Sequence, residues 1–103
     1  MEPGAIALTD AALEHSPSAP GVYALYRGDQ LTYVGLAEHG AGIRQSVENH
    51  LSGACAGCPQ QATAFSYELA RDPRRRHRQQ LSAYRERHAG RVPECNECQP
   101  CGC

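Results

Sequence analysis

The sequence has no tryptophan, no lysine and only one phenylalanine. A hydrophobic core must therefore be built mainly from Leu, Val and Ala together with the five tyrosines. A chain of 103 residues is long enough for one modest core, so we expect residues 1–103 to form a single domain.

The sequence also lacks a charge excess and a long apolar run. A formal net charge of -1 gives no overall attraction to nucleic acid or to an acidic membrane. No apolar stretch approaches the roughly 20 residues of a membrane span, so no membrane partner is expected. The N-terminal residues do not resemble a signal peptide, which predicts a cytoplasmic protein whose thiols stay reduced.

Two runs rich in β-branched and aromatic residues, 21–26 and 31–35, flank a Gly-Asp turn sequence within residues 27–30. This pattern predicts a β-hairpin. Because side chains alternate along a strand, the odd-numbered Tyr23 and Leu25 should face the side of the sheet opposite to their even-numbered neighbours.

Four further segments have readable patterns. A short helix is expected at residues 9–14, capped by Thr9, and a second at 43–51, where apolar residues recur every fourth position. A third strand is predicted at residues 63–69 and a final helix at about 74–88. The order predicts an α+β fold. Residues 1–8 are expected to be an unanchored start, and the tail 92–103 is expected to be irregular.

The hairpin begins with Gly-Val-Tyr at residues 21–23 and ends with Tyr-Val-Gly at residues 33–35. This stretch resembles the GIY-YIG nuclease family. The resemblance covers about residues 20–90 and implies a small three-stranded antiparallel sheet flanked by helices. His50 fits the family, in which a histidine closes the first helix. The alternative is a generic α+β domain with an accidental Gly-Tyr pattern.

The resemblance implies hydrolysis of a phosphodiester with one divalent cation. In the family one tyrosine helps to activate water, while a second tyrosine and an arginine bind the phosphate. Tyr23, Tyr33 and His50 match these positions and are the candidate catalytic residues. The family's arginine position reads Ser46, and Arg44 lies about 200° away around the helix.

The family's metal-binding glutamate has no counterpart, because residues 73–85 contain no carboxylate. Glu68 on the third strand is the nearest substitute. Arg74 and Arg78, with Arg44, are candidates for contact with phosphate or substrate. The alternative for the arginine-rich segment is an exposed helix face balanced by acidic neighbours. The sequence alone therefore leaves open whether nucleic acid is a partner.

Six cysteines form two groups that are candidate metal ligands. They are Cys55, Cys58, Cys95, Cys98, Cys101 and Cys103. Paired Cys-x-x-Cys motifs indicate a metal site in a reduced compartment. Disulfides in a secreted mini-protein and a disordered tail are the alternatives. Because four thiolates suffice for zinc and the tail repeats Cys-x2-Cys-x2-Cys, a [4Fe-4S] cluster is favoured over zinc.

These observations leave three hypotheses. The first is a GIY-YIG-like protein that has lost nuclease chemistry and uses a metallocluster in sulfur or redox chemistry on a small-molecule or carrier-bound substrate. The second is a metal-dependent endonuclease with a shifted Arg44. The third is a zinc-stabilised module that binds nucleic acid. In the family, both motif tyrosines and the histidine border the phosphate pocket. Because at most roughly 18 Å of chain separates His50 from Cys55, the resemblance implies a metal centre that borders the cleft containing Tyr23 and Tyr33.

Overall fold

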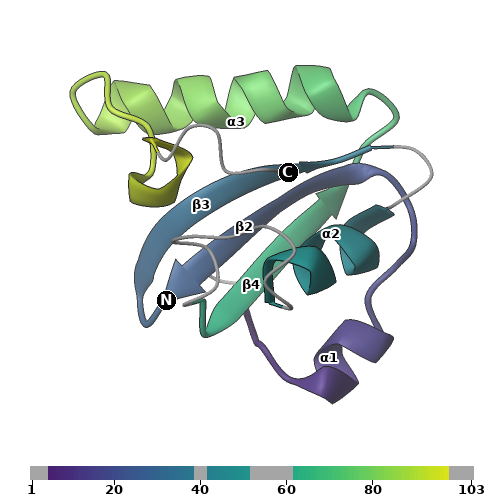
Figure 1. The fold of residues 1–103 in the computed structure, drawn as a ribbon. Coiled ribbons are helices and arrows are strands. Elements are labelled where there is room, and N and C mark those ends of the chain that lie inside the picture. Colours follow the sequence, from purple (N-terminus) through teal and green to yellow (C-terminus); the bar gives the residue numbers. More distant parts are fainter. Residues whose placement is uncertain (1–4, 39–41, 52–61, 98–103) are drawn as a thin grey trace.

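A four-stranded antiparallel sheet with the order β1-β4-β2-β3 forms the centre of the fold (Figure 1). The computed structural model describes residues 5–38, 42–51 and 62–97. The strands are β1 (Ile6–Ala7), β2 (Gly21–Arg27), β3 (Gln30–Ala37) and β4 (Ala64–Leu69). The α+β class predicted from the sequence is confirmed, and β2 lies between β3 and β4.

The prediction of three strands is wrong by one. Ile6 pairs with Phe65 and Ala7 with Ala64, which adds β1 to the edge of β4. These residues are therefore anchored, contrary to the expectation for residues 1–8. An open strand edge presents unpaired backbone groups, and even two residues can satisfy some of them. A strand this short has too few residues to show a period in the sequence.

The predicted hairpin is confirmed. β2 ends at Arg27 and β3 begins at Gln30, and Gly28 has φ +64°, a conformation that favours glycine. The alternation also holds, because Tyr23 and Leu25 join the hydrophobic core on one face of the sheet. The opposite face includes Val22 and Ala24, which face the last helix.

Helices cover both faces of the sheet (Figure 1). They are α1 (Asp10–Glu14), α2 (Gly42–Leu51) and α3 (Pro73–Arg87). On the face covered by α1 and α2, the core consists of Leu13, Tyr23, Leu25, Ala37, Ile43, Val47 and Phe65. The predicted cap of α1 is confirmed, because Thr9 Oγ1 accepts a hydrogen bond from the backbone of Ala12 at 3.1 Å. Among the described helices, none is long and apolar enough to cross a membrane.

Helix α3 begins at Pro73, one residue before its predicted start. The Asp72 side chain accepts a hydrogen bond from the backbone of Arg75 at 3.2 Å, and Pro73 occupies the first turn. Beyond α3, residues 94–97 form a short 3-10 helix, η2 (Glu94–Glu97), next to β3 in Figure 1. The tail is therefore regular over these four residues, where it was expected to be irregular.

Candidate functional site

The two glycines of the hairpin tripeptides allow close packing. Tyr23 and Gly35 are cross-strand partners, and a Cβ on Gly35 would collide with the phenol ring of Tyr23. A Cβ on Gly21 would collide with the backbone of Glu68 and Leu69 in β4. The last glycine of the second tripeptide thus gives room to the tyrosine of the first, which explains physically why the two tripeptides occur together.

Tyr23 and Tyr33 form an aromatic pair. Their ring centroids are 6.1 Å apart and the rings are tilted by 46°. Tyr23 is buried, with 4 % of its surface exposed, and Tyr33 packs at the edge of the core. Burial raises the pKa of Tyr23 far above its ordinary value, and the charge and hydrogen bond of Tyr33 raise it further. Burial therefore favours the protonated form of the Tyr23 phenol.

Arg44 joins α2 to α1. Its guanidinium donates to the backbone carbonyls of Ser16 at 3.2 Å and Glu14 at 2.6 Å. These bonds satisfy carbonyl groups next to the end of α1 and give Arg44 a structural role. Its predicted contact with phosphate stays a prediction. His50 lies in the last turn of α2, and its side chain is outside the described part of the structure.

The side chain of Asn96 binds the backbone of Val34 at two points. Its Oδ1 accepts a hydrogen bond from Val34 N at 2.8 Å, and its Nδ2 donates to Val34 O at 3.0 Å. The amide therefore pairs with the outer edge of β3 as a neighbouring strand would. Val34 is the middle residue of the second tripeptide. These two hydrogen bonds, called the Asn96 clamp below, therefore hold η2 against the candidate site.

Cys95 precedes the clamp residue and is completely buried. It is disulfide-bonded in the structure. His77 of α3 also donates through Nε2 to Val34 O, at 3.1 Å. The Val34 carbonyl therefore accepts from both the last helix and η2. A buried sulfur atom is thus held at the outer edge of the hairpin.

The other five predicted metal ligands, Cys55, Cys58, Cys98, Cys101 and Cys103, lie outside the described residues. Within residues 5–38, 42–51 and 62–97 there is no group of three or more His, Cys, Asp or Glu that could hold a metal ion. The described residues therefore locate one predicted ligand and leave the complete set as a prediction.

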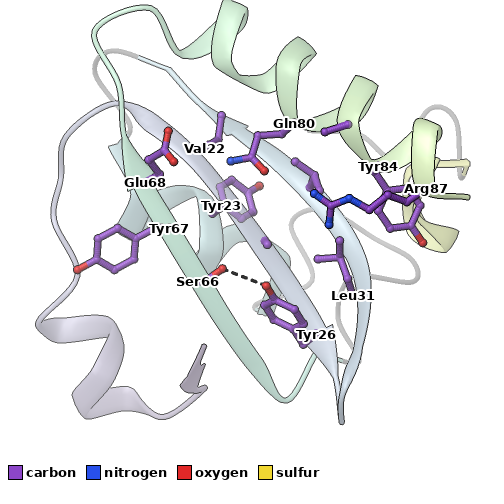
Figure 2. Close-up of a pocket in the computed structure, with 13 residues that line it drawn as sticks. Val22, Tyr23, Tyr26, Leu31, Ser66, Tyr67, Glu68, Gln80, Tyr84 and Arg87 are labelled. Carbon is purple, nitrogen blue, oxygen red and sulfur yellow. Dashed lines mark hydrogen bonds between the residues drawn. The ribbon is translucent and has the colours of Figure 1, made fainter. Parts of the chain in front are cut away.

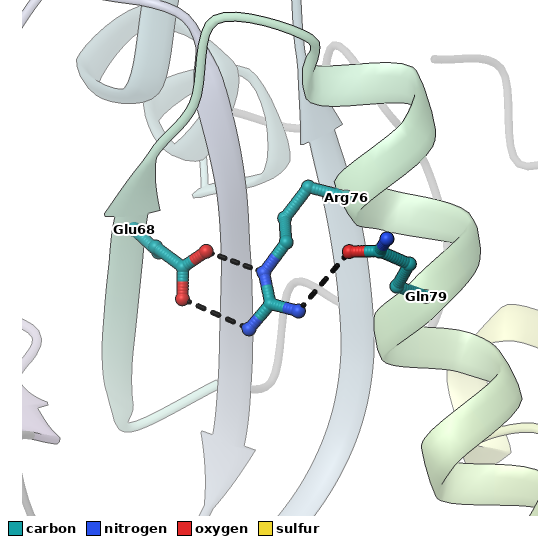
Figure 3. A network of polar contacts seen from close by, with 3 residues as sticks. All are labelled: Glu68, Arg76 and Gln79. Carbon is teal, nitrogen blue, oxygen red and sulfur yellow. Dashed lines mark hydrogen bonds and ion pairs between the residues drawn. The ribbon is translucent and has the colours of Figure 1, made fainter.

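Glu68, the proposed substitute for the missing metal ligand, is bound by Arg76 (Figure 3). Two nitrogens of the guanidinium contact the two carboxylate oxygens, one of them at 3.1 Å, and a third donates to Gln79 at 3.4 Å. A cation would have to displace this bidentate pair to bind Glu68.

The two arginines predicted to contact phosphate differ in their surroundings. Arg74 forms an ion pair with Glu38 at 2.6 Å, and both side chains are largely exposed. Arg78 is exposed on α3, and no ion pair involves it within the described residues. Neither arginine belongs to the core cluster that contains Tyr23 and against which Tyr33 packs.

The sequence-based interpretation missed Asn96 and the packing role of Gly35. Asn96 follows a cysteine in a segment without periodicity, and nothing in the local sequence indicates that its amide pairs with a residue 62 positions away. The Gly35 role could have been found, because a hairpin closed after residues 27–30 brings Tyr23 close to Gly35.

Comparison with models of protein families finds no match, and comparison with curated proteins also finds none. The function must therefore be inferred from the residues of the chain itself. Three features carry that inference: the tyrosine pair, the engaged Glu68 and the Asn96 clamp beside Cys95.

Proposed function

We propose that this chain is a GIY-YIG-like domain that has lost nuclease chemistry and holds a cysteine-ligated metal centre beside its second tripeptide. The centre is a [4Fe-4S] cluster in preference to zinc. The protein acts in sulfur or redox chemistry on a small-molecule or carrier-bound substrate. The observation that carries this proposal is the clamp of Asn96 on Val34, which holds the buried Cys95 at the hairpin edge.

The order of elements supports the family part of the proposal. The hairpin is followed by α2, β4 and α3, with β2 at the centre of the sheet. Tyr23 of the first tripeptide pairs with Gly35 of the second, and the absence of a Cβ on Gly35 leaves room for the Tyr23 ring. A chance occurrence of the two tripeptides would not require this fit.

The surroundings of three residues argue against the endonuclease alternative. Arg76 engages the carboxylate of Glu68, and Arg44 is hydrogen-bonded to the end of α1. The pKa of Tyr23 is raised by burial, which opposes its use as a base toward water. A hard cation such as magnesium takes oxygen ligands, and the described residues include no group of three or more His, Cys, Asp or Glu that could hold a metal ion.

The chemistry of Cys95 fits a soft metal. Thiolates that share one zinc ion at about 2.3 Å lie roughly 3.8 Å apart, so ligand sulfurs must gather closely. The disulfide at Cys95 is evidence that a second sulfur reaches this buried position. In a reducing compartment, the same two sulfurs would be free thiols that lie close enough together to bind one metal centre. The close Cys-x2-Cys-x2-Cys spacing of the tail is an element of cluster-binding sequences, which favours the cluster.

When bound, the cluster would supply electron transfer or an iron site for a sulfur or oxygen atom of the substrate. The chain's own residues would position that substrate. Tyr23 stays neutral, so its hydroxyl can take part in hydrogen bonds only as a phenol. Tyr33, the less buried member of the pair, is the one placed to meet a ligand. His50 is the proposed third pocket residue.

The test is anaerobic purification followed by measurement of iron, acid-labile sulfide and zinc per chain. We expect iron and sulfide in the wild type, and their loss in Cys95→Ser. Tyr33→Phe is the matched control, because it removes a hydroxyl near the centre without removing a ligand, and it should keep full iron content.

A nuclease assay with magnesium or manganese separates the alternatives. We expect negligible cleavage of DNA and RNA. Metal-dependent cleavage that Tyr23→Phe abolishes would instead establish the endonuclease. Stoichiometric zinc without iron would point to the zinc-stabilised module.

A further inference from the structure

A groove of about 360 Å³ lies between α3 and the sheet, on the face opposite to the α1 and α2 core (Figure 2). Its size falls at the lower end of the range for small-molecule sites, about 300–1,000 Å³. Cys95 is not among its lining residues. The residues that give it chemical character are Tyr26, Ser66, Gln80, Ala83, Tyr84 and Arg87.

The groove exists because the inward side of α3 is polar. Gln80, Ala83, Tyr84 and Arg87 have the spacing i, i+3, i+4 and i+7, so they form one stripe along the helix. In a helix that only covers a sheet, this stripe would be apolar and would fill the space. Here Ala83 is too short to reach the sheet, and of the residues of α3 only Pro73 is buried.

Two polar side chains of this stripe have no partner in the part of the chain that the structure describes. Within the described residues, neither Gln80 nor Arg87 makes a hydrogen bond or an ion pair. Figure 2 shows Arg87 extended from α3 toward β3. Glu68 at the rim is already neutralised by Arg76. The groove therefore carries one positive charge that no described carboxylate balances.

The remaining lining is suited to an aromatic body. Tyr84 is stacked on His88 with centroids 3.7 Å apart and an interplanar angle of 8°, which fixes the Tyr84 ring at the groove. The buried Val22 and Val34 belong to its apolar floor. At the other end, the Tyr26 and Ser66 hydroxyls lie 3.3 Å apart and offer polar contacts.

We propose that this groove binds a small aromatic anion. Its charged group pairs with Arg87 and the amide of Gln80, and its ring lies between Tyr84 and the apolar floor. Planar guanidinium groups bind carboxylates and phosphates in a fork geometry, and aromatic rings stack on tyrosine. The charged group can be a carboxylate or a phosphate ester, since both have the oxygens that Arg87 would recognise.

The structural alternative for Arg87 is that it only balances the helix dipole at the end of α3. Arg85 provides a matched control for this alternative. It lies in the same last turn and is exposed, but two positions correspond to about 200° around a helix. Arg85 therefore has the same charge near the same helix end and faces away from the groove.

The test is titration of the full chain with naphthoate, naphthyl phosphate and neutral naphthamide, followed by amide NMR shifts and calorimetry. We expect saturable binding of at least one anion, with shifts concentrated at Ala24, Ser66, Gln80 and Ala83. Tighter binding of naphthoate assigns a carboxylate, and tighter binding of naphthyl phosphate assigns a phosphate ester.

Three variants complete the test. Arg87→Gln should weaken anion binding by about fivefold, the effect expected for a partly exposed ion pair. Arg85→Gln should leave binding unchanged, and Ala83→Leu should abolish it by filling the groove while the helical signal in circular dichroism stays intact. Equal binding of naphthamide, equal weakening by Arg85→Gln, or no saturable shift at the groove residues would overturn the proposal.

Discussion

The two faces of the sheet are covered in opposite ways. Helix α2 has ten residues and places Ile43 and Val47 in the core with no surface exposed. Helix α3 has fifteen residues, and Pro73 is the residue it buries. The shorter helix therefore closes its face with apolar contacts, while the longer one binds its face through polar groups and leaves a groove.

This difference separates stability from binding. The burial of aliphatic side chains is the main favourable term in folding, so the α1 and α2 face should carry most of the free energy of unfolding. The α3 face is held by the pairs Arg76–Glu68 and His77–Val34, which are specific in geometry but weak when exposed. A ligand can therefore bind to the α3 face, or leave it, without unfolding the domain.

The largest expected effect is on the core face. Phe65 is fully buried, and Phe65→Ala should lower the free energy of unfolding by about 3–5 kcal/mol. Leu81 of α3 is only half-buried, and Leu81→Ala should cost about 1 kcal/mol. Urea denaturation measures both. Equal losses would show that the α3 face contributes as much to stability as the α1 and α2 face, contrary to the comparison.

The next effect concerns the fit of Tyr23 against Gly35. Gly35→Ala should destabilise the protein by about 1–3 kcal/mol, because the new methyl group collides with the ring. In a Tyr23→Ala background the same substitution should cost much less, since the ring is gone. A double-mutant cycle measures this coupling. Additive effects would mean that the two tripeptides do not depend on each other.

A smaller effect is expected at the edge of β3. Asn96→Ala removes both hydrogen bonds to Val34 and should cost about 1–2 kcal/mol. Amide hydrogen exchange at Val34 should accelerate as its N–H loses its partner. Thermal melting and exchange rates check the result. Unchanged protection at Val34 would show that η2 is not needed to cover this edge.

The smallest effect appears only at alkaline pH. Because the pKa of Tyr23 is raised in the folded state above its ordinary value of 10.0, the unfolded state releases this proton first. Stability is therefore retained below about pH 10 and falls above it, by up to about 1.4 kcal/mol per pH unit. Tyr23→Phe should flatten this slope, whereas Tyr67→Phe, at an exposed site, should not. Identical slopes would contradict the burial argument.

The sequence predicted those helices and strands whose local pattern extends over several residues. The hairpin is marked by alternation and a Gly-Asp turn, and α3 begins at Pro73, one residue before its predicted start. The added strand β1 was missed, because two residues show no period. The clamp of Asn96 was missed because it joins segments far apart in the chain.

The candidate site was predictable only in part. The tyrosine pair follows from the hairpin register, since Tyr23 and Tyr33 must then share a face. The engagement of Glu68 by Arg76 depends on how α3 crosses the sheet, which the pattern of α3 does not specify. Of the predicted cysteine ligands, only Cys95 lies within the described residues, so the full ligand set stays a prediction.

The central claim is that a metal centre is bound to Cys95 at the edge of the hairpin. The most direct measurement is anomalous diffraction, at the iron and zinc absorption edges, from crystals of anaerobically purified protein. The account predicts an anomalous peak at a bonding distance of about 2.3 Å from Cys95 Sγ, with Asn96 bound to Val34 beside it. A map with no such peak, in which Cys95 forms a disulfide under reducing conditions, would contradict it.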